Sequence, residues 1–168
     1  MQVVHEFGHV LHAWASGGAV ARVHLNPLDI SRTDLARNPH PLVVAWGGAI
    51  WGCVLPLGGF WLVRTVAPRH AYLATFLAGF CLLTNGAYLA VGSFNGVGDA
   101  GDLMRIGSPR WLLILFGLPA CGLGLYLWNG LGPSFGLGVA NGQVDRRAAL
   151  GVTFALVILV LMEFAFSA

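Results

Sequence analysis

Residues 42–63 read LVVAWGGAIWGCVLPLGGFWLV, a run of 22 positions without a charged side chain. A helix of about 20 apolar residues crosses the hydrocarbon core of a bilayer, so this run is long enough to span it. Three further runs share this character: residues 71–91, residues 111 to about 131, and residues 148–162, the last extended by residues 164–168 past Glu163. The sequence therefore predicts an all-α polytopic membrane protein with about four full transmembrane helices.

The overall composition agrees with a membrane environment. Of the 168 residues, 57% are hydrophobic and 10% are charged, whereas roughly 25% of the residues are charged in an ordinary soluble domain. The net charge is only +2 and the arginines are scattered, so we expect no nucleic-acid partner. The three cysteines, Cys53, Cys81 and Cys121, lie in apolar runs without a CxxC pair, and we expect them to be buried apolar groups.

A short segment ahead of these runs carries the most specific chemical signal. Residues 2–16 are predicted to form a helix that ends at Gly17-Gly18, and they contain HEFGH, an HExxH motif. His5 and His9 are four residues apart, so on a helix both imidazoles can reach one metal ion. Zinc lowers the pKa of a bound water to about 7, and Glu6 can accept the proton as that water attacks a carbonyl group. The alternative is a chance match, but an ionisable Glu6 in an apolar helix favours a functional site.

A catalytic zinc ion has three protein ligands and one open position. The candidates for the third ligand are Asp99 and Asp102 in the sequence GDAGD, which follows a long apolar run. The alternative for this pair is that the carboxylates cap a short helix over residues 103–106. His12, three residues beyond His9, is a further candidate ligand or a polar neighbour of the site.

The segment after the motif helix has the pattern of a small sheet. Residues 20–25 alternate between two faces, which is typical of a strand. Asn26-Pro27 predicts a turn, and residues 28–30 are predicted to return as the second strand. We therefore expect a short β-hairpin beside the metal site.

The order of these features resembles the site-2 protease family of intramembrane zinc metalloproteases. Four features carry the resemblance: HEFGH with the strand-like segment after it, GGA at residues 47–49, TNG at residues 84–86, and GDAGD about 90 residues after the first motif. The resemblance covers roughly residues 1–110. Two departures stand out. The family's Asn-x-x-Pro reads Asn85-Gly-Ala-Tyr88 here. Only four residues precede HExxH, which predicts an N-terminally incomplete chain, a wrongly assigned start or, failing both, a zinc near a membrane face.

The resemblance implies a three-helix catalytic core in which zinc is held by two histidines and one aspartate. By position, His5 and His9 become ligands, Glu6 the catalytic base and Asp99 the third ligand, and Asn85 is the candidate for the family's polar asparagine. Asp102 and His12 remain as alternative ligands or neighbours of the site.

The resemblance also implies a function. It predicts one membrane-embedded domain over residues 1–168, with a catalytic core at about 1–110 and accessory helices at about 111–168. The implied activity is zinc-dependent endoproteolysis of transmembrane or membrane-proximal segments, so the expected partners are a membrane-protein or membrane-peptide substrate and the lipid bilayer. The alternatives are a catalytically inactive pseudo-protease with a binding or regulatory role, and a small transporter or channel subunit.

Because hydrolysis inside a bilayer needs both water and an unwound peptide, the site requires a polar pocket. We expect a cavity that joins the metal site to the loop at residues 94–98. The candidate lining residues are His12, Asn85, Asn95 and whichever of Asp99 and Asp102 does not bind the metal.

Overall fold

The uncharged run at residues 42–63 forms the centre of helix α2 in the computed structural model, which describes residues 1–167 and side chains as far as residue 165. Ala168, the last residue of the predicted fourth run, lies outside the described residues. The elements in chain order are α1 (Gln2–Ala15), β1 (Ala19–His24), β2 (Arg32–Arg37), α2 (Pro41–Val66), η1 (Pro68–His70), α3 (Ala71–Asn95), α4 (Gly98–Arg105), α5 (Arg110–Trp128), η2 (Gly132–Phe135), η3 (Gly138–Ala140) and α6 (Arg146–Ser167).

The predicted fold class is confirmed. Within the described part of the chain, four helices are long and apolar enough to cross a membrane: α2, α3 together with η1, α5 and α6. The motif helix ends at Ala15, close to its predicted end, and Gly17 follows with a φ of 76°. The helix of the third run ends earlier than predicted, at Trp128, because Asn129 is extended with a φ of −60° and a ψ of 127°. Gly130 follows with a φ of 77°.

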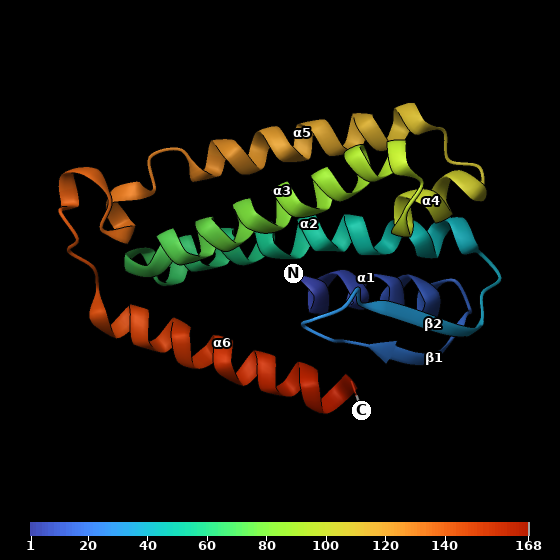
Figure 1. Ribbon diagram of the computed structural model, residues 1–168, viewed down its shortest axis with the longest axis horizontal. Helices are drawn as coiled ribbons and strands as arrows, with labels where there is room; N and C mark the ends of the chain where they lie inside the picture. The colour runs from blue at the N-terminus through green and yellow to red at the C-terminus, as the bar shows by residue number, and fades with distance from the viewer. Residues whose placement is uncertain (168) are drawn as a thin grey trace.

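Helices α2, α3 and α5 lie side by side, and α1 lies against α2 (Figure 1). Glycines allow the helix backbones to approach closely at these contacts. A Cβ atom on Gly47 would lie 2.5 Å from the Gly8 carbonyl oxygen, and one on Gly86 would lie 2.6 Å from the Gly117 carbonyl oxygen. Small residues at helix contacts are typical of membrane bundles, where packing rather than the hydrophobic effect holds helices together.

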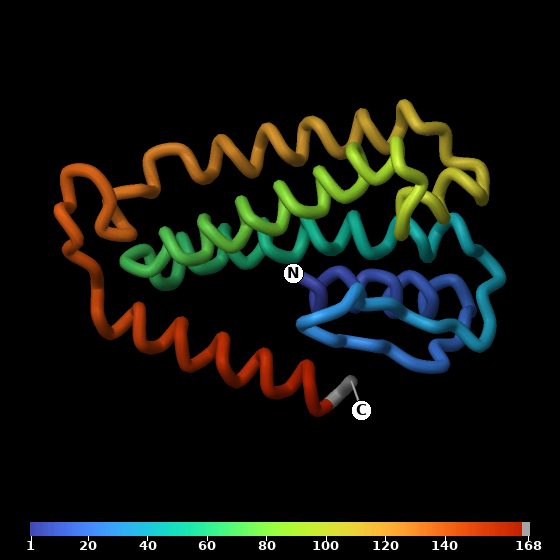
Figure 2. The backbone as a smooth tube through the Cα atoms, viewed as in Figure 1, coloured from blue at the N-terminus to red at the C-terminus, as the bar shows by residue number. Residues whose placement is uncertain are grey.

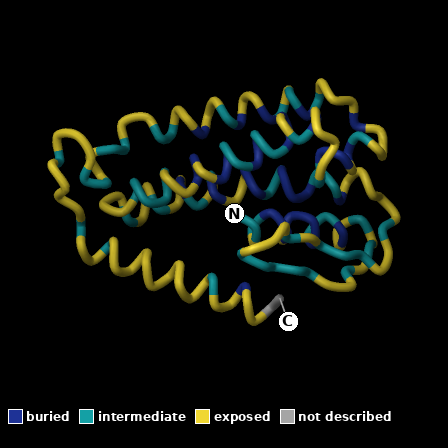
Figure 3. The backbone as a smooth tube through the Cα atoms, in the orientation of Figure 1, coloured by how far each residue is buried: buried dark blue, intermediate teal, exposed yellow. Residues whose placement is uncertain are grey.

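The tube in Figure 2 shows which elements gather at one end of the bundle: α1, the two-stranded sheet, and α4 with the connections that precede and follow α4. Figure 3 shows that the buried positions are concentrated at this end, whereas α6 is almost entirely exposed. Only 6% of the most apolar window of α6 is buried, against 44% for that of α3. The exposed apolar surface is consistent with a membrane protein, and the buried end is where the HExxH helix lies.

The hairpin after α1 is confirmed, but the predicted position of its second strand is wrong. β1 pairs with β2 in antiparallel fashion, whereas residues 28–30 lie in the connection between the strands. The connection is held by side chains that hydrogen-bond to the nearby backbone. Asn26 Oδ1 accepts from the backbone N–H two residues on at 2.9 Å, and Asp29 Oδ1 accepts from the next N–H at 2.7 Å. These local bonds favour a turn over strand pairing.

Candidate metal centre

Helix α1 places its three motif residues in the protein interior. His5 is 5% exposed, Glu6 is 3% exposed and His9 is 8% exposed, although all three side chains are polar. The spacing of four residues brings the two imidazoles onto one face of the helix, with ring centroids 4.9 Å apart. Buried polar groups require partners, so the surroundings of these side chains decide what the site can do.

Helix α2 leaves space for both imidazoles. A Cβ atom on Gly48 would lie 2.5 Å from His5 Nε2 and closer still to His9 Nε2. Real Cβ atoms essentially never approach a heavy atom closer than 3.0 Å. The absence of a side chain at Gly48 therefore creates the space in which the two Nε2 atoms converge.

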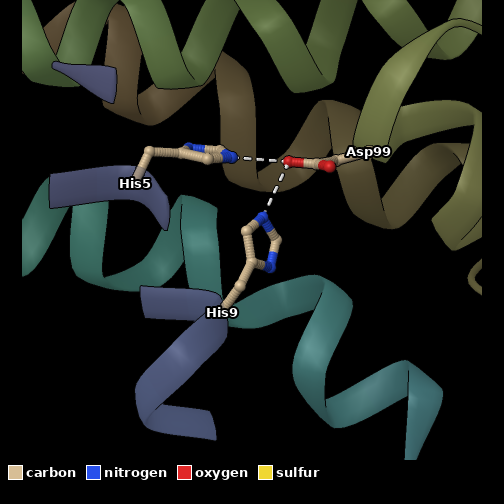
Figure 4. Close-up of side chains that lie close together, drawn as sticks. All are labelled: His5, His9 and Asp99. Atoms are coloured by element: carbon tan, nitrogen blue, oxygen red, sulfur yellow. Dashed lines mark hydrogen bonds and ion pairs between the residues drawn. The ribbon is translucent and has the colours of Figure 1, made fainter. Parts of the chain in front are cut away.

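Helix α4 brings Asp99 to the same point. The chain reverses after α3 through Gly96 and Gly98, which have φ values of 64° and 59°. The Asp99 backbone N–H donates to the Tyr88 hydroxyl oxygen at 3.3 Å, which ties the start of α4 to α3. Asp99 Oδ2 then lies 2.6 Å from His5 Nε2 and 3.3 Å from His9 Nε2 (Figure 4). The donor atoms of these three residues all lie within 4.8 Å of one another.

The other nitrogen of each imidazole has its own partner. His9 Nδ1 lies 2.8 Å from the Val44 carbonyl oxygen, which can only accept, so Nδ1 carries the proton. His5 Nδ1 lies 2.7 Å from Asn85 Oδ1, and the Asn85 amide nitrogen donates to the Cys81 carbonyl at 2.8 Å. That second bond orients the amide so that its oxygen accepts from His5. Partners of this kind fix the tautomer of metal-ligating histidines.

The convergence of His5 Nε2, His9 Nε2 and Asp99 Oδ2 requires a cation. With both Nδ1 atoms protonated, each neutral imidazole presents a lone pair at Nε2, and an ionised carboxylate has only acceptors. Either protons or a metal ion must therefore lie between these atoms. Two imidazole nitrogens and one carboxylate oxygen are a ligand set that fits zinc, with a fourth position left open.

Without a metal, the pKa values of Asp99 and His9 shift in the directions that favour a negative carboxylate beside a positive imidazole. Burial alone would raise the pKa of Asp99, but the hydrogen bonds and charges of His5 and His9 hold that pKa well below its usual range. Burial alone would lower the pKa of His9, but the hydrogen bond and charge of Asp99, with the Val44 carbonyl, raise it overall. The metal-free site therefore favours an ionised aspartate beside a protonated histidine.

Glu6 lies next to this cluster but outside the group of three ligand atoms. Its Oε1 accepts a hydrogen bond from Ser31 Oγ at 2.8 Å, and its Oε2 accepts one from Thr33 Oγ1 at 2.7 Å. The sequence did not point to these two hydroxyl residues, because a serine and a threonine near a strand carry no signal for a contact with a distant helix.

The remaining sequence candidates take different places. Helix α4 begins at Gly98, not at residue 103, so Asp102 lies inside the helix, where its side chain is 60% exposed and lies 3.3 Å from Arg105 Nη2. The Nδ1 atom of His12 lies 2.6 Å from the Val43 carbonyl oxygen. Among the described residues, neither Asp102 nor His12 belongs to the group of ligand atoms, whereas Asn85 contacts a ligand directly.

Two cavities meet the site from different sides. The larger, about 520 Å³, is lined by the hairpin, the start of α2 and α4, and the smaller, about 240 Å³, lies between the N-terminal residues, the hairpin connection and α3. Both are lined by Glu6, Ser31 and Asp99. The prediction that the cavity leads to the loop at residues 94–98 is wrong for these two cavities, because neither is lined by that loop. Helix α4 packs against α3 there, and both cavities are lined by the hairpin or its connection instead.

No family model matches the chain, and no curated protein or solved structure matches it either. The assignment of a function therefore depends on the geometry of the site itself.

Proposed function

We propose that this chain is a zinc-dependent intramembrane endopeptidase of the site-2 protease type. The observation that carries the proposal is the convergence of His5 Nε2, His9 Nε2 and Asp99 Oδ2. Glu6 lines the same two cavities as Asp99. The four span-length helices support a multi-pass integral membrane protein, with the bilayer as its surroundings.

His5, His9 and Asp99 would hold the zinc ion. When bound, zinc supplies a Lewis acid that polarises the scissile carbonyl group and acidifies a water molecule. The Glu6 carboxylate accepts the proton of the attacking water and returns it to the leaving nitrogen. Asn85 and the Val44 carbonyl hold the two imidazoles in orientation while this happens.

The substrate is proposed to be an unwound segment of a membrane protein or membrane peptide. Helical peptide bonds are shielded by their own hydrogen bonds, so the segment must unwind before it reaches Glu6. The two cavities that share Glu6, Ser31 and Asp99 provide space on both sides of the scissile bond. Residues of β2 line the larger cavity, and an extended substrate can pair with a strand edge there.

The test is cleavage of a labelled transmembrane peptide by the purified protein in lipid vesicles. We expect turnover that a chelator abolishes and added zinc restores. Glu6→Gln should lower turnover at least about 100-fold, because an amide cannot accept the proton. The zinc content of this variant should equal that of the wild type, because Glu6 is not a ligand in the proposal.

Each other outcome has a distinct meaning. Turnover by Glu6→Gln at the wild-type rate would contradict the role of Glu6 as a base. Loss of zinc from Glu6→Gln would make Glu6 a ligand. A wild-type protein that binds zinc but cleaves no membrane peptide would favour the pseudo-protease instead, and one that binds no zinc would remove the metalloprotease proposal.

A further inference from the structure

We infer that the hydroxyl groups of Ser31 and Thr33 are positioning groups for the base, holding the Glu6 carboxylate at the angle needed for proton transfer. This inference depends on the proposed function, because it assigns a role to the contacts of the residue proposed as the base. It adds a second element, the β-hairpin, to a catalytic motif that the sequence confines to α1.

Both carboxylate oxygens of Glu6 are fixed from outside its own helix. Ser31 Oγ donates to Oε1 at 2.8 Å and Thr33 Oγ1 donates to Oε2 at 2.7 Å. A glutamate side chain has three rotatable torsion angles, and helix geometry restricts mainly the first of them. Two hydrogen bonds, one to each oxygen, fix the plane of the carboxylate, which the helix by itself leaves free.

The contacts leave room for the chemistry. An ionised carboxylate has about four acceptor positions, two on each oxygen. The two hydroxyl groups occupy one position on each oxygen, so each oxygen of Glu6 keeps another for the attacking water. Ser31 and Thr33 therefore hold the base without blocking it.

The positions of these two residues explain why they act together. Ser31 directly precedes β2 and Thr33 is the second residue of that strand, and both hydroxyl groups reach Glu6 of α1. The alternate residues, Arg32 and Asp34, pair with each other at 3.3 Å, and Asp34 also contacts His24 of β1 at 2.9 Å. The charged pair therefore makes its contacts within the hairpin, and the two hydroxyl groups reach Glu6.

This arrangement links the position of the base to the strand that lines the larger cavity. Glu6, Ser31 and Thr33 all line that cavity. A peptide that pairs with β2 would be aligned against the same strand that holds the base. The hairpin would thus position both the Glu6 carboxylate and the substrate, and so set the distance between Glu6 and the scissile bond.

The kinetic test uses variants that remove a hydroxyl group and variants that keep it. Thr33→Val and Ser31→Ala, alone and combined, should lower kcat by about 10- to 100-fold, because small displacements of a catalytic group are costly. KM should change by no more than about twofold, and zinc should stay at one per chain, because neither ligands nor metal are touched. Thr33→Ser keeps the hydroxyl group and should retain a kcat near the wild-type value. Thr65→Val removes an exposed hydroxyl group that donates to the Leu62 carbonyl, far from Glu6 in the sequence, and it should behave like the wild type.

A second measurement tests the contact in the metal-free protein, without any turnover. Hydrogen exchange in the hairpin connection, residues 25–31, should accelerate about tenfold in Glu6→Ala and in the Ser31→Ala/Thr33→Val double variant. Because both changes break the same bonds, combining them should produce no further acceleration. Additive or absent effects would overturn the inference.

The outcomes separate the two claims. If the wild type cleaves its substrate and the double variant cleaves equally fast, the positioning role is wrong and the proposed function stands. If the double variant loses zinc or fails to fold and the single variants keep full kcat, the hydroxyl groups have a structural role only, and the inference is overturned. If the wild type neither binds zinc nor cleaves, the proposed function fails and the positioning role fails with it.

Discussion

Replacement of Gly48 by alanine tests whether the space between α1 and α2 is built for a metal site. The added Cβ would lie 2.5 Å from His5 Nε2, and it must retreat to at least 3.0 Å, or to 3.4 Å for an ordinary contact. Because the same Cβ would lie still closer to His9 Nε2, both imidazoles or the α2 backbone must shift by at least roughly 0.5–0.9 Å. Metal and catalytic sites tolerate displacements of about 0.5 Å, and loss of a group that orients a metal-ligating histidine costs about 10- to 100-fold in metal affinity. We expect Gly48→Ala, which displaces the ligands themselves, to lower the affinity for zinc by about 10- to 100-fold.

The assay is zinc competition against a fluorescent chelator, with the protein in detergent. Gly58→Ala is the matched control, because Gly58 lies in the same helix and a Cβ there would meet nothing within 4 Å. Gly58→Ala should bind zinc as the wild type does, and both variants should remain folded, as judged by circular dichroism. Equal zinc affinity in Gly48→Ala and Gly58→Ala would show that the methyl group added at Gly48 does not lie close to bound ligands, and that His5 and His9 do not hold the metal there.

Three further changes test other parts of the site. Asp99→Asn should lose most of its zinc while Asp102→Asn keeps one ion per chain, as measured by metal analysis of the purified variants; the reverse result would exchange the two roles. Asn85→Leu removes the acceptor for His5 Nδ1 and should weaken zinc binding by about 10- to 100-fold in the same competition assay. The metal-free protein should be most stable between about pH 3.8 and 6.5. The pKa of Asp99 is lowered from its ordinary value of 3.8, so Asp99 stabilises the folded protein above pH 3.8, and this stability is lost as the pH falls through the folded pKa. The pKa of His9 is raised from its ordinary value of 6.5, so His9 stabilises the folded protein below pH 6.5, and this stability is lost as the pH rises through the folded pKa. A Tm of metal-free protein that climbs steadily from pH 6.5 to 8 would contradict this.

The sequence predicted those features that depend on local spacing. Uncharged runs of about 20 residues predict spanning helices from length alone, and four such helices are present within residues 1–167. The separation of His5 and His9 by one helical turn predicts that they share a face, and both side chains are buried on that face.

The features that the sequence left open depend on distant contacts. Asp99 and Asp102 are equivalent in the local sequence GDAGD, and they are distinguished only by where the reversal at Gly96 and Gly98 directs α4. The hydrogen bond from the Asp99 backbone to Tyr88 is likewise a tertiary contact. No local pattern can specify such contacts.

The second strand was misplaced for a related reason. β2 reads RTDLAR, and its three charged residues hide the apolar alternation that indicates a strand. Its place is set by pairing with β1 and by the contact between Thr33 and Glu6, which are 27 residues apart. The segment Leu28-Asp29-Ile30 instead follows the turn that Asn26 holds.

X-ray absorption at the zinc edge of the purified protein reports both the presence of the metal and its ligands. We expect one zinc ion per chain, with nitrogen and oxygen neighbours at about 2.0–2.1 Å and the outer-shell scattering of two imidazoles. Asp99→Asn should reduce the bound zinc, whereas Asp102→Asn should leave the spectrum unchanged. Protein that retains no zinc, or a spectrum with sulfur at about 2.3 Å from one of the cysteines, would contradict the assignment of His5, His9 and Asp99 as the metal centre.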